Sequence, residues 1–324
     1  MRRPLRSCLA VLGALAAFAG CSANVLPAPG QVMLVLATDM TPGRDFDTLV
    51  VRVADPTLSS ELLYDWRFRA AGGGRFEGDI TLPSTVAIVR QTQASGAVTS
   101  VRVEARLAGV PRVVREASVV VPSSGIQMLR MSLDWLCWDM MPTGTTGAAN
   151  GLTCAEGSSC TGGACTASSS DSTLATWDPA MVFGEPGARD RADGCFQVLG
   201  CFRGGFTVTP TLDRQGACSF AFAGSADQLN VAVALPPSPP RGFCARDACL
   251  VPMDQGGVSG WRLDAGRVVV PRRVCTDGRT LAFSTSCAPK TEAKPPCAEW
   301  SSVGLTPAAN NDVITLGLQP AGGT

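Results

Sequence analysis

The sequence predicts an all-β protein made of two antiparallel β-sandwich-like modules joined by a small disulfide-rich segment. Short runs rich in Val and Leu are separated by clusters of Gly, Pro, Asp and Ser along most of the chain. No long amphipathic helical pattern competes with these runs. A chain of 324 residues that is 45% hydrophobic is large enough for two separate cores.

Residues 1–20 have the order of a secretory signal peptide. Arg2, Arg3 and Arg6 form a basic start, and an apolar run from Cys8 to Phe18 follows. About eleven apolar residues are too few to cross a bilayer, which needs about 20. The segment therefore predicts export and removal.

The residues Phe18-Ala19-Gly20-Cys21 resemble the lipobox of bacterial lipoproteins, and they depart from it at Phe18, where the family usually has Leu. The resemblance implies cleavage before Cys21 and acylation of that cysteine with diacylglyceride and palmitate-type chains. Ser22 follows, which in the family does not mark retention at the inner membrane, so we expect an outer-membrane location on the periplasmic or surface side. The alternative is an ordinary signal peptide cut near Ala19 or Ser22, which leaves Cys21 a thiol.

Charge and hydropathy limit the partners of the exported chain. Removal of three arginines leaves 27 − 3 = 24 basic groups against 27 acidic ones, a net charge near −3. No basic stripe predicts nucleic-acid binding. No later run reaches 18 apolar residues, so we expect the membrane to be contacted through the lipid alone.

The cysteines predict a disulfide framework. Of the 14 cysteines, Cys8 lies in the signal and Cys21 would carry the lipid, which leaves an even number in an oxidising compartment. The twelve candidates are Cys137, Cys154, Cys160, Cys165, Cys195, Cys201, Cys218, Cys244, Cys249, Cys275, Cys287 and Cys297. The sequence does not choose their pairing.

The chain contains no histidine. This excludes Ser-His-Asp and Cys-His nucleophile systems in their usual form, together with His-bearing zinc and iron sites. We expect no metal, no cofactor and no enzymatic activity.

Residues 21–30 form a lipidated tether, and residues 31–136 form the first predicted module. Its strand-like runs are Val32–Ala37, Thr48–Ala54, Leu62–Phe68, Arg75–Leu82, Thr85–Arg90, Val98–Leu107, Val110–Val121 and Ile126–Leu133. Strict alternation from Val101 to Leu107 predicts a strand whose Arg102, Glu104 and Arg106 meet water.

Residues 137–173 form a cysteine-rich knot followed by a Ser-rich linker. The segment Cys154–Cys165 has too little apolar mass for a core, so crosslinks must hold it. A zinc-thiolate site is the alternative, but the CxxC pairs of zinc ribbons are missing.

Residues 174–324 form the second, disulfide-rich β module. Its strand-like runs are Phe206–Leu212, Cys218–Ala223, Leu229–Leu235, Ala248–Met253, Arg267–Val270, Leu281–Ser286 and Val313–Leu318. Cys244 and Cys249 could form a redox pair beside Arg246, but their spacing differs from the CxxC of thioredoxin-like enzymes, which favours a structural disulfide.

Three polar or aromatic groups carry alternative functional interpretations. Asp39, Asp45 and Asp47 could bind calcium, although a turn whose aspartates accept backbone amides fits the spacing better. Trp177, Trp261 and Trp300 are candidates for stacking against a sugar, or else core residues. The carboxylates that could serve a glycan hydrolase are Glu61, Glu77, Asp79, Glu104, Asp254, Asp264 and Glu299.

An acylated start, a β-rich first half, the knot and a cysteine-rich end together resemble uncharacterised cysteine-rich envelope proteins of myxobacteria. The resemblance covers most of the chain and implies no activity. The sequence therefore predicts a lipid-anchored envelope protein with a structural or binding role, whose partner is a glycan or another envelope protein. A carboxylate-dependent glycan hydrolase is the alternative.

Overall fold

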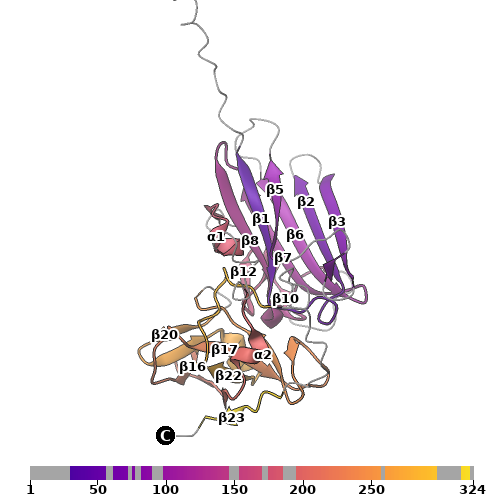
Figure 1. Cartoon of the computed structure of the whole chain (residues 1–324). Helices are drawn as coiled ribbons and strands as arrows, with labels where there is room; N and C mark the ends of the chain where they lie inside the picture. Colours follow the sequence, from indigo (N-terminus) through magenta and orange to yellow (C-terminus); the bar gives the residue numbers. More distant parts are fainter. Residues whose placement is uncertain are drawn as a thin grey trace, which may run out of the picture.

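The computed structural model describes residues 30–55, 61–71, 75–76, 82–89, 98–145, 153–169, 174–184, 195–256, 260–297 and 315–321. Two β-sandwiches lie end to end within this part of the chain, the first above the second (Figure 1). The predicted all-β class is confirmed. The predicted signal peptide, Cys21 and Trp300 lie outside the described residues, so those predictions remain untested.

The first sandwich consists of a four-stranded sheet in the order β13-β8-β1-β5 and a five-stranded sheet in the order β4-β3-β2-β6-β7. The strands of the four-stranded sheet are β1 (Gln31–Thr38), β5 (Ser84–Val89), β8 (Ile126–Leu133) and β13 (Leu174–Thr176). Those of the five-stranded sheet are β2 (Thr48–Asp55), β3 (Glu61–Ala71), β4 (Arg75–Phe76), β6 (Val98–Leu107) and β7 (Val110–Val120).

Most pairings in the first sandwich are antiparallel, but β1 and β8 run parallel, with Gln31 opposite Ile126. The predicted strands agree with the observed ones to within a few residues, except the run from Arg75, of which only β4 lies within the described residues. The predicted start of the second module at residue 174 is wrong, because the residues that follow belong to the first sandwich. Strand β13 and helix α1 (Ala180–Phe183) pack on the first sandwich, because Leu174 pairs with Leu129 and Val182 contacts Val35.

The outer face of β6 corrects one expectation. Val101, Val103 and Ala105 are buried as predicted, but Glu104 is only 1% exposed rather than solvated. Arg52, Arg102 and Arg106 surround its carboxylate, with N–O distances of 3.1 Å from Arg52 and 2.6 Å from Arg102. The long arginine side chains cover the shorter carboxylate, and they hold the pKa of Glu104 below its usual value although burial alone would raise it.

The second sandwich consists of a six-stranded sheet in the order β18-β19-β17-β22-β14-β23 and a four-stranded sheet in the order β15-β16-β21-β20. The six-stranded sheet contains β14 (Phe206–Val208), β17 (Asn230–Leu235), β18 (Phe243–Cys244), β19 (Cys249–Pro252), β22 (Thr280–Ser284) and β23 (Gln319–Pro320). The other sheet contains β15 (Thr211–Leu212), β16 (Cys218–Ala221), β20 (Arg262–Asp264) and β21 (Arg267–Val270).

Both faces of the six-stranded sheet are covered. On β17, Val231 and Val233 face the main core, whereas Ala232 faces a second cluster beside helix α2 (Val198–Cys201). Double-sided burial explains why the sequence of β17 is almost wholly apolar instead of alternating.

The connecting segment contains the short helix η2 (Trp135–Cys137) and four short strands, β9 (Met141–Pro142), β10 (Thr153–Cys154), β11 (Ser158–Thr161) and β12 (Ala164–Ala167). All twelve candidate cysteines form disulfides. The pairs are Cys137–Cys160, Cys154–Cys165, Cys195–Cys297, Cys201–Cys287, Cys218–Cys275 and Cys244–Cys249. The thiolate-zinc and free redox-pair alternatives do not fit these bonds.

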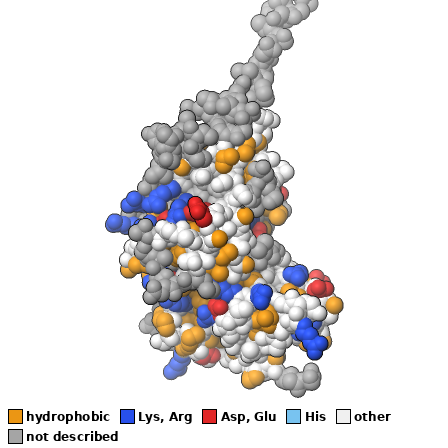
Figure 2. Space-filling view, turned by 180° about the vertical axis from the view of Figure 1, so that it is seen from behind, with side chains coloured by type: hydrophobic (Ala, Val, Ile, Leu, Met, Phe, Trp, Pro, Cys, Tyr) orange, Lys and Arg blue, Asp and Glu red, His pale blue; other side chains and the backbone are white. Residues whose placement is uncertain are grey.

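One continuous hydrophobic core contains residues of both sandwiches. In sequence order, its buried members begin at Val32 and end at Leu281. On the surface, hydrophobic side chains are dispersed in small groups, and basic side chains gather around acidic ones on the first sandwich (Figure 2). Among the residues that the structure describes, no helix has the length and apolar character needed to cross a membrane.

Candidate functional site at the junction

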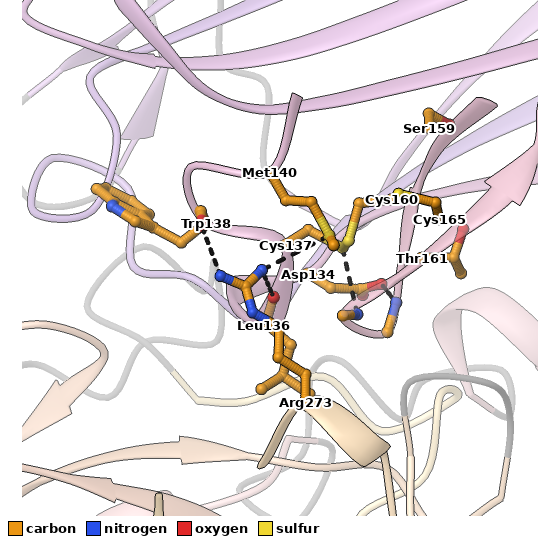
Figure 3. The surroundings of a disulfide bond; sticks show 12 residues. Asp134, Leu136, Cys137, Trp138, Met140, Ser159, Cys160, Thr161, Cys165 and Arg273 are labelled. Carbon is orange, nitrogen blue, oxygen red and sulfur yellow. Dashed lines mark hydrogen bonds between the residues drawn. A yellow bond between two sulfur atoms is a disulfide. The ribbon is translucent and has the colours of Figure 1, made fainter. Parts of the chain in front are cut away.

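The junction between the sandwiches is built around Arg273, which lies on helix α3 (Arg272–Thr276) of the second sandwich. Its guanidinium reaches into the connecting segment and donates to the carbonyl oxygens of Leu136 at 2.5 Å and Trp138 at 3.3 Å (Figure 3). Its Nε donates to Asp277 at 3.1 Å. These bonds satisfy carbonyl oxygens at the end of a short helix, where no following turn supplies N–H donors.

The Cys137–Cys160 disulfide lies directly beside this arginine (Figure 3). It ties η2 to β11, and the Gly163 amide donates toward Cys137 Sγ at 3.4 Å. Gly163 has φ of +79°, and a Cβ there would lie 2.8 Å from the Cβ of Arg273. Only glycine permits this conformation and this approach together.

A second set of bonds crosses the junction at Asp45 and Gly242. Asp45 is 0% exposed, and each of its carboxylate oxygens accepts the Gly242 amide at 3.1 Å. Arg44 donates to the Gly242 carbonyl at 2.8 Å. Burial raises the pKa of Asp45 above its usual value, although the amide hydrogen bonds from Thr41 and Gly242 oppose that shift.

A pocket of about 220 Å³ opens between the connecting segment and the second sandwich. We call it the aromatic–arginine pocket. Its lining residues are Trp135, Leu136, Trp138, Leu235, Pro236, Pro239, Arg241, Arg273, Asp277 and Arg279. The Arg241 guanidinium carbon lies 4.2 Å from the centre of the Trp138 ring, and that of Arg279 lies 5.2 Å from the Trp135 ring. Stacked cations hold both rings in place.

Two donors of this pocket have no hydrogen-bond partner among the described residues. They are Trp135 Nε1 and Arg279 Nε, and both atoms are buried. A buried donor without an acceptor costs about 1–3 kcal/mol. Because these two nitrogens are closed off from the space of the pocket, they are a cost of the fold and not contacts for a ligand.

A smaller pocket of about 40 Å³ lies on another side of the junction. We call it the acidic pocket. Its ionisable lining residues are Asp39, Arg130, Asp134, Asp254, Lys290 and Glu292. Lys290 pairs with Asp254, and Arg130 Nε lies 3.0 Å from Glu292 across the junction.

Two carboxyl groups of the acidic pocket have perturbed pKa values. Burial raises the pKa of Asp134 to about 6, against the opposing effects of the Gly162 amide and Arg115. Burial also raises the pKa of Asp39, and the nearby Asp134 charge raises it further. A proton on this pair therefore stabilises the junction.

Most predicted site residues lie elsewhere. Trp261 is 1% exposed, so it is a core residue, and the stacking interpretation is wrong for it. Trp177 is half-buried against Val35 and Val182 and lines neither pocket. Trp300 lies outside the described residues.

The three aspartates proposed for calcium are separated in their roles. Asp39 accepts the Trp135 amide at 2.7 Å, Asp45 accepts Thr41 and Gly242, and Asp47 accepts the Ala108 amide at 2.7 Å. The predicted turn is confirmed for Asp45, which accepts the Thr41 amide of its own loop, whereas Asp39 and Asp47 accept amides from distant parts of the chain. Within the described ranges, no group of Asp, Glu, Cys and His could hold a metal ion.

Three of the seven carboxylates considered for hydrolysis have described side chains, and of these three Asp254 alone lines one of the two pockets. Glu104 is buried in its arginine cluster, and Asp264 is exposed at the end of β20. Glu77, Asp79 and Glu299 lie outside the described residues, and the side chain of Glu61 is likewise outside them.

The pocket residues were missed because they come from three distant segments, 135–138, 235–241 and 273–279. The nearest signal in the sequence is the pair of tryptophans, Trp135 and Trp138, that follows β8. The chain matches no protein-family model, and no curated protein and no solved structure shows significant similarity to it.

Proposed function

We propose that this chain is a lipid-anchored protein of the bacterial cell envelope, acylated at Cys21, which binds a ligand at the junction of its two sandwiches. The role is a binding and structural one without catalysis. The partner is a glycan or another envelope component. The outer membrane is the proposed location, on its periplasmic or surface side.

The observation that carries the binding role is the aromatic–arginine pocket between the connecting segment and the second sandwich. Buried hydrogen bonds at Asp45 and Arg273 fix the junction, so the pocket exists before any ligand arrives. Preformed concave sites with a few convergent polar groups are the usual places for small ligands. The six disulfides support the extracytoplasmic address, since such bonds persist in oxidising compartments.

The direction of β1 suits an anchor at the N-terminal side. Strand β1 starts at the end of the first sandwich that is remote from the second and runs toward the junction (Figure 1). Eight residues of strand span about 26 Å. A lipid attached upstream of β1 would hold the pocket well away from the membrane surface, where soluble or polymeric ligands can reach it.

The acidic pocket does not favour a hydrolase. Its carboxyl groups are close together, but about 40 Å³ holds a water molecule or two and no sugar ring. Asp39 and Asp134 already accept backbone amides, and Asp254 is paired with Lys290. We therefore keep these groups as parts of the junction.

The binding role is tested with the full acylated chain in a panel of envelope polysaccharides and in a crosslinking pull-down from intact cells. We expect capture by the wild type, loss of capture by Trp138→Ala, and retention by Trp177→Ala. Trp177 is the matched control because it is also half-buried but packs on the first sandwich away from the pocket. If the wild type captures nothing in both assays, the proposal is wrong.

A further inference from the structure

The size of the aromatic–arginine pocket limits its ligand. An apolar cavity of about 150 Å³ accommodates benzene. The pocket offers about 220 Å³ and is walled by Trp135, Leu136, Trp138, Leu235 and two prolines. It therefore suits a single six-membered ring with small substituents.

The charge of the lining limits the ligand further. Three arginines and one aspartate give 3 − 1 = 2 net positive charges around the pocket. Arg273 is occupied by two carbonyls and by Asp277, which also lies 3.6 Å from Arg279. The guanidinium of Arg241 donates no hydrogen bond to any described residue, so this cation is available to an anion.

Arg241 is the group that can receive an anion. Its guanidinium carbon lies 4.2 Å from the centre of the Trp138 ring, and its charge also acts on the buried Asp45 carboxylate. An anionic oxygen accepts from a guanidinium N–H group more strongly than a neutral one. A carboxylate supplies several acceptor positions on a small group.

We infer that the aromatic–arginine pocket binds a six-membered ring bearing one carboxylate, as found in a uronic acid unit of a polysaccharide or in an aromatic acid. This inference rests on the proposed binding function and names its ligand class. The ring packs against the tryptophan and proline walls. The carboxylate accepts from the guanidinium of Arg241 beside the Trp138 ring.

Calorimetric titration of the full chain tests this with four probes: glucuronate, its uncharged counterpart glucose, benzoate, and benzyl alcohol. We expect at least one acid to bind at least about tenfold more tightly than its neutral counterpart, because hydrogen bonds to charged groups are strong. Tighter binding of glucuronate assigns the pocket to an acidic polysaccharide. Tighter binding of benzoate assigns it to an aromatic acid.

Two pairs of variants locate the site. Arg241→Met removes the cation that would receive the carboxylate, and Arg262→Met makes the same change on exposed β20. Trp138→Leu removes a wall of the pocket, and Trp177→Leu makes the same change at a half-buried tryptophan outside it. We expect the acid's affinity to fall about tenfold in Arg241→Met and Trp138→Leu and to stay unchanged in both controls.

The inference is overturned if neither acid binds, if the neutral probes bind equally well, or if the control variants lose as much affinity as the pocket variants. Circular dichroism at the titration temperature identifies any variant that is not folded, and Arg241→Gln then replaces Arg241→Met. A positive polysaccharide panel or pull-down together with failed acid binding would reject the ligand class and leave the proposed binding function standing.

Discussion

The two sandwiches reach the same architecture by different means. Strands β1, β2, β6, β7 and β8 of the first are 8 to 11 residues long, and no disulfide links two of them. Strands of the second are 2 to 6 residues long, and four disulfides lie within it. Long hydrogen-bonded ladders stabilise the first sandwich, whereas crosslinks restrict the unfolded chain of the second.

Buried carboxyl groups also differ between the first sandwich and the junction. In the first sandwich, Glu104 is buried as a carboxylate among arginines. At the junction, burial keeps the proton on Asp39 and Asp134 to higher pH than usual. One region therefore gains stability from ionisation, and the other loses it.

Removal of a disulfide from the second sandwich should have the largest effect on stability. Cys218→Ala combined with Cys275→Ala opens a loop of 57 residues and should lower the free energy of unfolding by about 4 kcal/mol. The matched change at Cys154 and Cys165 opens 11 residues and should cost about 3 kcal/mol. Denaturant unfolding measures both.

Hydrogen exchange separates the two sandwiches in the same variants. We expect β16 and β21 to lose amide protection in the first double variant, while β6 and β7 keep theirs. Equal loss of protection in β6 and β7 would show that the hydrogen-bonded strands of the first sandwich do not stabilise it independently of the second.

Gly163→Ala tests the close packing at the junction. The substitution places a Cβ 2.8 Å from Arg273 in a left-handed conformation, and we expect a loss of about 3 kcal/mol in the free energy of unfolding. Gly157→Ala has a similar φ of +71° with no atom within 4 Å of the added Cβ, so it should cost about 1 kcal/mol. Thermal unfolding of the two variants gives the difference, and equal melting temperatures would mean that Arg273 gives way without cost.

Glu104→Gln tests whether the buried carboxylate and its arginines stabilise the first sandwich. The amide cannot balance three guanidinium groups, so we expect a loss of about 2 kcal/mol at pH 7. Because the folded pKa of Glu104 is lowered, its stabilisation is present above the usual value of 4.5 and is lost as the pH falls through the folded value. Urea unfolding should show that the variant and the wild type converge in acid; a constant difference down to pH 2 would argue against this origin.

The junction should show the opposite pH dependence. The pKa of Asp134 rises from 3.8 to about 6 on folding, so its favourable contribution is complete below 3.8 and is lost as the pH rises to about 6. The slope is at most about 1.4 kcal/mol per pH unit. Asp134→Asn should flatten the fall in melting temperature between pH 4 and 6, and an unchanged profile would contradict the assignment.

The strands of the first sandwich were predictable because alternation marks a sheet with one buried face. Those of the second were less so. The run from Phe206 to Leu212 is two strands in different sheets, β14 and β15, because Pro210 has no amide to donate between them. The predicted run ending at Leu318 is not a strand in its described part, and β23 begins at Gln319.

The pocket could not be predicted, since no local pattern places residues 135–138, 235–241 and 273–279 together. The burial of Glu104 was missed for a related reason. Alternation fixes which face a side chain is on, but the arginines that cover Glu104 come from the neighbouring strand β2 as well as from β6 itself.

We propose that this protein is acylated and held in the cell envelope, and intact mass spectrometry of the protein purified from membranes is the decisive measurement. We expect a mature chain that begins at Cys21 and carries the mass of a diacylglyceryl group, with or without a further acyl chain on its amine. An unmodified Cys21, or a mature chain that begins at any other residue, would contradict it.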